Sequence, residues 1–107
     1  MRFYRGDTKR FKFQILDANG ELVTATPTSL YFTVRKFADC PKVIFQKSLG
    51  DGIVTDDEGN YYIDILPEDT ANLEAGIYGF DREVVFGEIV ATQTGKLELL
   101  ADYTRRN

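Results

Sequence analysis

The feature that most constrains this chain is a period-two alternation of apolar and polar residues, broken by turn signals at intervals of roughly 8–12 residues. Residues 11–15 and 30–35 show the alternation most clearly. Further strands are expected at residues 43–45, 53–55, 61–65, 78–86, 89–92 and 97–99, with residues 93–95 as the turn of the last pair. The pattern predicts an all-β domain, a β-sandwich of seven to eight antiparallel strands; a small barrel is the alternative.

One stretch departs from the alternation and predicts a short helix over residues 67–73. Pro67 suits the first helical position, where a missing N–H costs nothing. Glu68 and Asp69 place negative charge beside the positive end of the helix. Gly76 is permissive enough to end the turn before the next strand.

The spacing of Leu73, Gly76 and Tyr78 resembles the tyrosine corner of immunoglobulin-like sandwiches. There, a Tyr at the start of a late strand donates its hydroxyl to the upstream backbone. The alternative is a helical turn that leads into any strand. In the same strand Arg82 falls in the apolar row, so it must be paired, near an exposed strand end or displaced by a bulge.

Two segments are expected at the edges of the sheet. Residues 21–26 predict a short edge segment that Pro27 ends. Residues 43–45 predict a short edge strand with Lys42 and Lys47 guarding its two ends.

Composition limits the classes of function. The 107 residues fit one domain, residues 1–107, and the net charge of −4 argues against a nucleic-acid partner or an anionic membrane surface. The chain has no histidine, and Cys40 is its single cysteine, so an intrachain disulfide is impossible. Residues 1–5 lack the apolar core of a signal peptide. We expect a protein made in a reducing cytoplasm and kept there, or assembled from there into something larger.

No catalytic, cofactor-binding or metal site is expected, and the chain is interpreted as a non-enzyme. The acidic turns at residues 17–20 and 56–60 offer oxygen atoms for calcium, but neither has a complete ligand set, and Asp, Asn and Gly are what a tight turn needs. Cys40 has no histidine to activate it as a nucleophile.

Two short motifs are weighed against plainer interpretations. Arg5-Gly6-Asp7 spells a tripeptide that integrins bind on extracellular loops, yet it is more simply a kink before the next strand. Arg105 and Arg106 form a separate basic pair, either a frayed terminus or a contact with an acidic neighbour in an assembly.

Several short motifs follow one another along the chain: Arg5-Gly6-Asp7-Thr8, Asp17-x-x-Gly20, Leu30-x-Phe32-x-Val34-Arg35-Lys36, Pro67-Glu68-Asp69-Thr70-x-x-Leu73-x-x-Gly76-x-Tyr78-x-Phe80-Asp81, Gly95-x-Leu97 and Asp102-Tyr103-Thr104-Arg105. Taken in this order, the motifs resemble a family of small phage virion modules, namely the N-terminal immunoglobulin-like domain of upper-baseplate proteins and short free-standing phage structural proteins. The resemblance implies a virion component without enzymatic activity or cofactor, in the tail, baseplate or capsid. Its implied partners are other virion proteins and symmetric copies of itself. Contacts are then expected on strand edges and on residues 1–5 and 102–107.

Two other classes of function remain as alternatives. A carbohydrate- or host-surface-binding module would use exposed aromatic rings, for which Tyr31 and Tyr62 are the candidates. An enzyme would need a cleft of convergent polar residues, which the sequence does not indicate.

Overall fold

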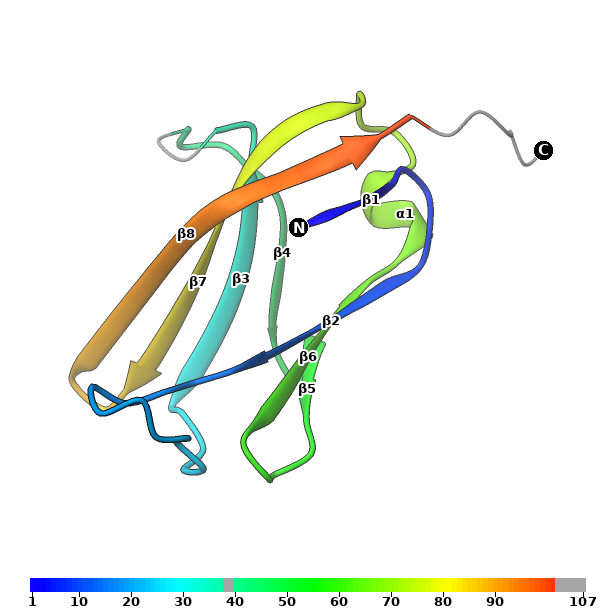
Figure 1. The fold of residues 1–107 in the computed structure, drawn as a ribbon. Helices are drawn as coiled ribbons and strands as arrows, with labels where there is room; N and C mark the ends of the chain where they lie inside the picture. Colours follow the sequence, from blue (N-terminus) through cyan, green and yellow to red (C-terminus); the bar gives the residue numbers. More distant parts are fainter. Residues whose placement is uncertain (38–39, 102–107) are drawn as a thin grey trace.

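The structure is a computed structural model that describes residues 1–37 and 40–101. Eight strands form a single, nearly closed sheet with one short helix (Figure 1), which confirms the predicted all-β, sandwich-like class. The elements are β1 (Arg2–Tyr4), β2 (Lys9–Gln14), β3 (Ser29–Arg35), β4 (Val43–Leu49), β5 (Gly52–Thr55), β6 (Asn60–Ile65), α1 (Pro67–Thr70), β7 (Gly76–Phe86) and β8 (Ile89–Leu100).

The order of the strands places β1 and β2, which are consecutive in the chain, at the two ends of the sheet. That order is β1-β8-β7-β3-β4-β5-β6-β2. The pairs β1–β8 and β4–β5 are parallel and the others are antiparallel, whereas the sequence predicted antiparallel strands throughout. The parallel pair β4–β5 involves two residues of each strand, on either side of the tight turn that joins the strands. Gly50 in this turn and Gly52 at the start of β5 both have positive φ.

The core is built from the inward rows of the strands, as the alternation predicted. β6 alternates between half-buried and buried residues along its whole length, and Leu30, Phe32 and Val34 of β3 are fully buried. Thr33 is buried on the opposite face of β3, where its hydroxyl accepts a hydrogen bond from Gln46. The core residues are Phe3, Leu30, Phe32, Val34, Ile53, Tyr61, Ile63, Ile65, Leu97 and Leu99.

At one end of the molecule the gap between the two ends of the sheet is sealed. Phe3 of β1 packs edge-on against Phe11 of β2, with ring centroids 5.7 Å apart. Nearby, the backbone N–H of Gly6 donates to the hydroxyl of Thr70, a fully buried residue of α1. We call this region, made of β1, α1 and the start of β2, the closed end.

Helix α1 begins at Pro67, as predicted, but ends at Thr70 rather than near residue 73. The Asp69 carboxylate accepts a hydrogen bond from the N–H of Leu66 and forms an ion pair of 2.7 Å with Lys47 Nζ. Both charged side chains are largely buried. A helix of one turn is too short to be stable alone. Here it is stabilised by the hydrogen bond between Gly6 and Thr70 and by the ion pair between Lys47 and Asp69.

The position of Lys47 corrects the expectation for the fourth strand. Lys47 lies inside β4, which continues to Leu49, and β4 lies between β3 and β5 rather than at an edge. The lysine is therefore a partner of α1 and not a guard against edge-to-edge pairing. This partner lies 22 residues further along the chain, so the local pattern could not reveal it.

The predicted turn at residues 93–95 is wrong. β7 and β8 form one long hairpin around Gly87 and Glu88, and β8 runs without interruption through Gly95. A Cβ on Gly95 would lie 2.5 Å from the ring of Phe80, its partner on β7. Gly95 thus makes room for an aromatic ring on the neighbouring strand.

The segment predicted as a short edge at residues 21–26 is not a strand. It meets the chain after β2 through an isolated bridge between Leu16 and Leu22, and the N–H of Val23 donates to the carbonyl of Ile15. Asp17 turns the chain between these segments by accepting hydrogen bonds from the N–H groups of Asn19 and Glu21.

The interaction predicted for Tyr78 is confirmed. Its hydroxyl donates to the carbonyl oxygen of Glu74 at 2.5 Å, which ties the start of β7 to the turn after α1. Partial burial of the ring raises the pKa of Tyr78, and the negative charge of Glu74 adds to this effect. The bond itself lies at the surface, so its removal leaves groups that water can reach.

Candidate functional site

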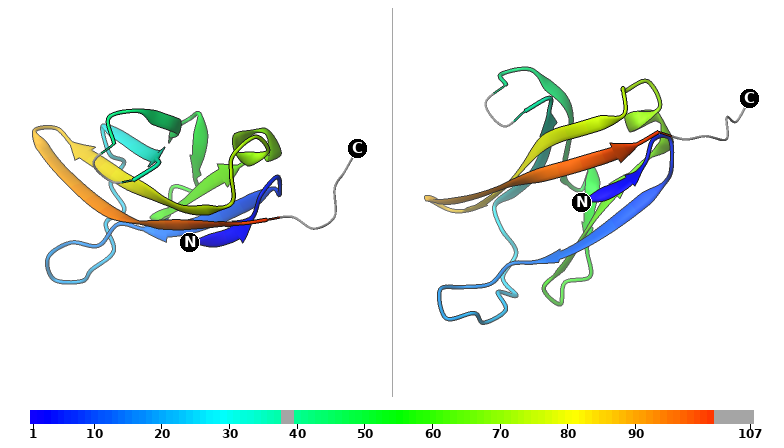
Figure 2. Two further views of the ribbon diagram at one scale, coloured as in Figure 1. Left: turned by 90° about the horizontal axis from the view of Figure 1, so that it is seen from above. Right: turned by 45° about the horizontal axis from the view of Figure 1, so that its top comes forward.

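Opposite the closed end, the end of β2 lies near the tip of the β7–β8 hairpin. Figures 1 and 2 show this tip and the chain that follows β2 at the same end of the molecule. Between them lies a pocket of about 130 Å³, smaller than the usual site for a small molecule. Such a volume suits one large side chain. The pocket is lined by Phe13, Gln14, Ile15, Leu16, Arg82, Val84, Phe86, Ile89, Ala91 and Gln93.

Arg82 is the charged residue of this pocket, and the structure decides among the three explanations given for it. The register of β7 with both neighbours is continuous through Arg82, so no bulge displaces it. Its guanidinium group lies 4.7 Å from the centre of the Phe13 ring and donates a hydrogen bond to the side-chain oxygen of Gln93. Arg82 is therefore paired, but with neutral groups.

Partial burial lowers the pKa of Arg82, and no neighbouring charge counteracts this effect. Within residues 1–37 and 40–101, no carboxylate lies within ion-pair distance of its guanidinium group. Arg82 thus brings a partly desolvated positive charge to an otherwise apolar pocket.

The edge of β8 that borders this pocket has no strand beside it. β1 pairs with β8 at Glu98, Leu99 and Leu100, and in the described part of the chain no strand pairs with residues 89–95 on that side. This stretch carries no charge and no proline, and Ile89 and Val90 are 70% and 58% exposed. We call residues 89–95 and the adjacent pocket the open end.

This edge was not predicted from the sequence, because residues 93–95 were expected to form a turn. The available signal was a run of seven uncharged residues that includes four β-branched ones, Ile89, Val90, Thr92 and Thr94.

The acidic turns that offered a calcium reading use their oxygen atoms internally. The Asp56 carboxylate accepts hydrogen bonds from the side chain of Asn60 and from the N–H of Glu58, and these bonds lower its pKa. Asp57 and Gly59 adopt positive φ in the same turn. The described residues include no group of three or more side chains of Asp, Glu, Cys or His placed to hold a metal.

The Arg5-Gly6-Asp7 tripeptide is the kink between β1 and β2, in agreement with the plainer interpretation. Gly6 has a φ of +80°, and Arg5 donates a hydrogen bond from Nη1 to the carbonyl of Leu73. All three residues are partly buried. The tripeptide therefore joins β1 to the region around α1 and does not project from an exposed loop.

The two tyrosines considered for carbohydrate binding lie on different strands. Tyr31 belongs to β3 and Tyr62 to β6, with β4 and β5 between them in the sheet. The guanidinium group of Arg10 lies 5.3 Å from the centre of the Tyr62 ring, so one face of that ring is already occupied.

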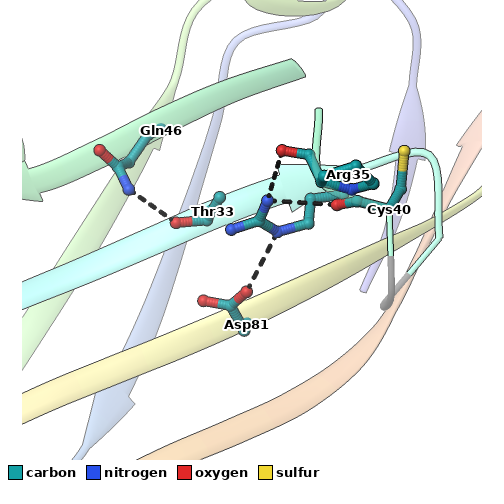
Figure 3. Close-up of polar contacts among 6 residues, drawn as sticks. Thr33, Arg35, Cys40, Gln46 and Asp81 are labelled. Carbon is teal, nitrogen blue, oxygen red and sulfur yellow. Dashed lines mark hydrogen bonds and ion pairs between the residues drawn. The ribbon is translucent and has the colours of Figure 1, made fainter. Parts of the chain in front are cut away.

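Cys40 lies in a loop held by Arg35, and Figure 3 shows these contacts. Arg35 donates hydrogen bonds to the carbonyl oxygens of Cys40 and Pro41 and forms an ion pair of 3.6 Å with Asp81. Through Arg35, the backbone at Cys40 and Pro41 is thus linked to Asp81 of β7. Arg105 and Arg106 lie outside the described residues.

These features define a class: an all-β module with a single curled sheet in which residues 89–95 of β8, at the open end, have no strand beside them on one side within the described residues. A scan against protein-family models and a search of curated proteins give no match. Among solved structures, the chain is similar to the endo-beta-1,4-mannanase from Thermotoga petrophila, with a TM-score of 0.59 and 14% sequence identity. The match covers 94% of this chain and 17% of the mannanase chain. At this identity the similarity concerns the fold alone.

Proposed function

We propose that this chain is a non-enzymatic structural component of a phage particle and packs in symmetric copies into a tail, baseplate or capsid assembly. The virion assignment comes from the motif resemblance. The observation that best supports an assembly role is the unpaired, uncharged edge of β8, because such an edge offers a row of backbone donors and acceptors to another chain. Many modest contacts of this kind, repeated by symmetry, add up to a stable assembly.

One of the expected contact segments, residues 1–5, also has a role inside the fold. Residues 1–5 were expected to act as a docking segment, but β1 is part of the sheet and Phe3 is 5% exposed. The N-terminal segment thus contributes to the fold of the chain itself. The other expected contact, residues 102–107, lies outside the described residues.

The proposal is tested by mass spectrometry of purified phage particles. The particles come from the phage whose genome encodes this chain and are purified on a density gradient. Peptides of the chain are expected at a copy number that is a multiple of the symmetry of the tail, baseplate or capsid. A particle preparation that contains the other virion proteins but none of this chain would overturn the assignment.

Carbohydrate binding is the alternative from another class. The separation of Tyr31 from Tyr62 and the contact between Arg10 and Tyr62 argue against one aromatic platform. Strong and selective binding of the isolated domain on a glycan array would favour this alternative over the assembly role.

A further inference from the structure

We propose that the edge of β8 at residues 89–95 accepts an extended segment of a partner protein as an added strand, with an acidic side chain of the segment pairing with Arg82. A large apolar side chain of the same segment then occupies the adjacent pocket. The inference rests on the proposed assembly role and names the chemistry of the contact.

The backbone of β8 presents its free hydrogen-bonding groups at known positions. The carbonyl of Lys96 and the N–H of Glu98 bond to Met1, on the side away from β7. Since the groups of a strand alternate from side to side and the β7–β8 register is continuous, the N–H and C=O of Val90, Thr92 and Thr94 face this same side. An added strand would find three residues ready to pair.

The edge lacks the features that usually prevent such pairing. Natural edge strands carry charges, prolines or bulges, and residues 89–95 have none of these in sequence or register. By contrast β2, at the other end of the sheet, carries Lys9, Arg10 and Lys12. The unguarded edge is therefore suited to a partner.

The pocket and Arg82 specify which segment would fit. In strand addition the backbone bonds give affinity, and pockets for alternate side chains give selectivity. The pocket of about 130 Å³ is mainly apolar, which favours a Leu, Ile or Phe side chain. Arg82, which lies in the same pocket and has no carboxylate partner among the described residues, favours Asp or Glu nearby.

The charge around the opening supports an acidic occupant. β2 faces the opening with Phe13 of its inward row, and three basic residues precede Phe13 in the same strand. Arg10 is neutralised by Asp64 at 2.6 Å and Lys9 lies at the closed end, while Lys12 is exposed one residue before Phe13. At the pocket itself Arg82, with Lys12 one residue before Phe13, therefore favours an acidic side chain over a basic one.

The probes are nine-residue peptides with uncharged, blocked termini. In each peptide Thr alternates with an apolar residue, Leu, Ile or Phe, and one of these apolar residues is replaced by Glu, Gln or Lys. Binding to the full chain is measured by fluorescence anisotropy at low and moderate salt. We expect Glu peptides to bind at least about tenfold more tightly than the matched Gln peptides, and Lys peptides to bind most weakly. The inference is wrong if no Glu peptide of the set binds. It is also wrong if the matched Gln and Lys peptides bind as tightly as the Glu peptides.

Two variants locate the contact. Thr92→Pro removes one outward N–H without touching the bonds to β7, and edge strands tolerate proline at such a position; it should abolish binding of the Glu peptide. Thr92→Val keeps the N–H and serves as the matched control, with binding within about twofold of the original chain. Circular dichroism and thermal melting confirm that both variants are folded. Unchanged binding by folded Thr92→Pro would overturn the location.

Arg82→Gln tests the charge pairing separately. We expect it to weaken binding of the Glu peptide by about tenfold and to leave the Gln peptide within about twofold. An equal loss for both peptides would mean that Arg82 shapes the pocket and does not select the acid.

Two further measurements keep this inference apart from the proposed function and from self-association. If particles incorporate the Thr92→Pro chain at normal copy number, the β8 contact is wrong while the virion role stands; if the original chain is absent from particles, the virion role itself fails. Light scattering of the purified chain measures its oligomeric state. A dimer that Thr92→Pro dissociates would show that the occupant is a second copy, which overturns the acidic partner.

Discussion

The closed end and the open end of the molecule differ in how far the gap between the two edges of the sheet is bridged. At the closed end β1 lies beside the last residues of β8, and Phe3 reaches across to Phe11 of β2. At the open end β8 continues with β7 on one side and, within the described residues, no strand on the other, and the guanidinium group of Arg82 contacts the Phe13 ring of β2. The difference teaches that three residues of β1 are enough to close a sheet where an aromatic pair can be buried.

The two unpaired strand edges, that of β2 and that of residues 89–95 of β8, also differ in their charge. β2 carries Lys9, Arg10 and Lys12, which oppose pairing with another chain, whereas residues 89–95 of β8 are uncharged. A protein selected only for solubility would guard both edges. The asymmetry supports the proposed contact at β8, and the following changes test the two ends separately.

The largest effect is expected from Phe3→Ala at the closed end. Phe3 is 5% exposed and packs on Phe11, so its removal should lower the free energy of unfolding by about 3–5 kcal/mol. Urea denaturation followed by circular dichroism measures the change. Tyr4→Ala is the matched control on the same strand, since Tyr4 is 50% exposed, and should cost less than about 1 kcal/mol. Equal losses would show that β1 does not seal the sheet through Phe3.

Gly95→Ala tests the point where β8 passes from the open end to the closed end. The new methyl group would meet the ring of Phe80, and we expect a loss of about 1–3 kcal/mol. Thr94→Ala, at the exposed neighbouring position, is the control and should cost under about 1 kcal/mol. A neutral Gly95→Ala in thermal unfolding would contradict the close packing of Phe80 over β8.

Local patterns predicted the inward rows of the strands, because the side-chain period of two belongs to each strand by itself. The hydrogen bond of Tyr78 was also predictable, since Glu74 is only four residues away. The role of Gly95 depends instead on Phe80 of the adjacent strand, and that of Lys47 on Asp69. These contacts join distant residues, so one sequence read locally could not reveal them.

The same reason explains the limits at the candidate site. The sequence identified Arg82 as a problem because a charge stood in an apolar row. It did not reveal the answer, since Gln93 and Phe13 come from two other strands. The order of the strands, which leaves residues 89–95 of β8 without a neighbour on one side in the described part of the chain, depends on every pairing in the sheet at once.

A smaller effect is expected from Tyr78→Phe. The variant loses the hydrogen bond to Glu74, but the bond lies at the surface, so we expect a loss of about 0.5–1.5 kcal/mol in urea denaturation. Tyr62→Phe is the control: Tyr62 is half-buried under Arg10, and its change should stay within about 0.5 kcal/mol. If the two losses were equal, the hydroxyl of Tyr78 would have no special part in fixing the start of β7.

The smallest effect concerns the guarded edge and its dependence on pH. The hydrogen bond from Arg10 holds the pKa of Asp64 below its usual value. A carboxylate with a lowered pKa stabilises the folded state above its unfolded pKa of about 4, and this contribution is lost as the pH falls through the folded value. Because the pair is solvent-exposed, Asp64→Asn should lower the melting temperature at pH 7 by about 2 °C at most.

The difference in melting temperature between the variant and the original chain should shrink as the pH falls from about 5 to about 3, as measured by thermal melting at each pH. A difference that grows on acidification would mean that another titrating group controls this edge. Since Asp64 neutralises Arg10, the variant should also leave β2 more positive and its edge no more prone to pairing.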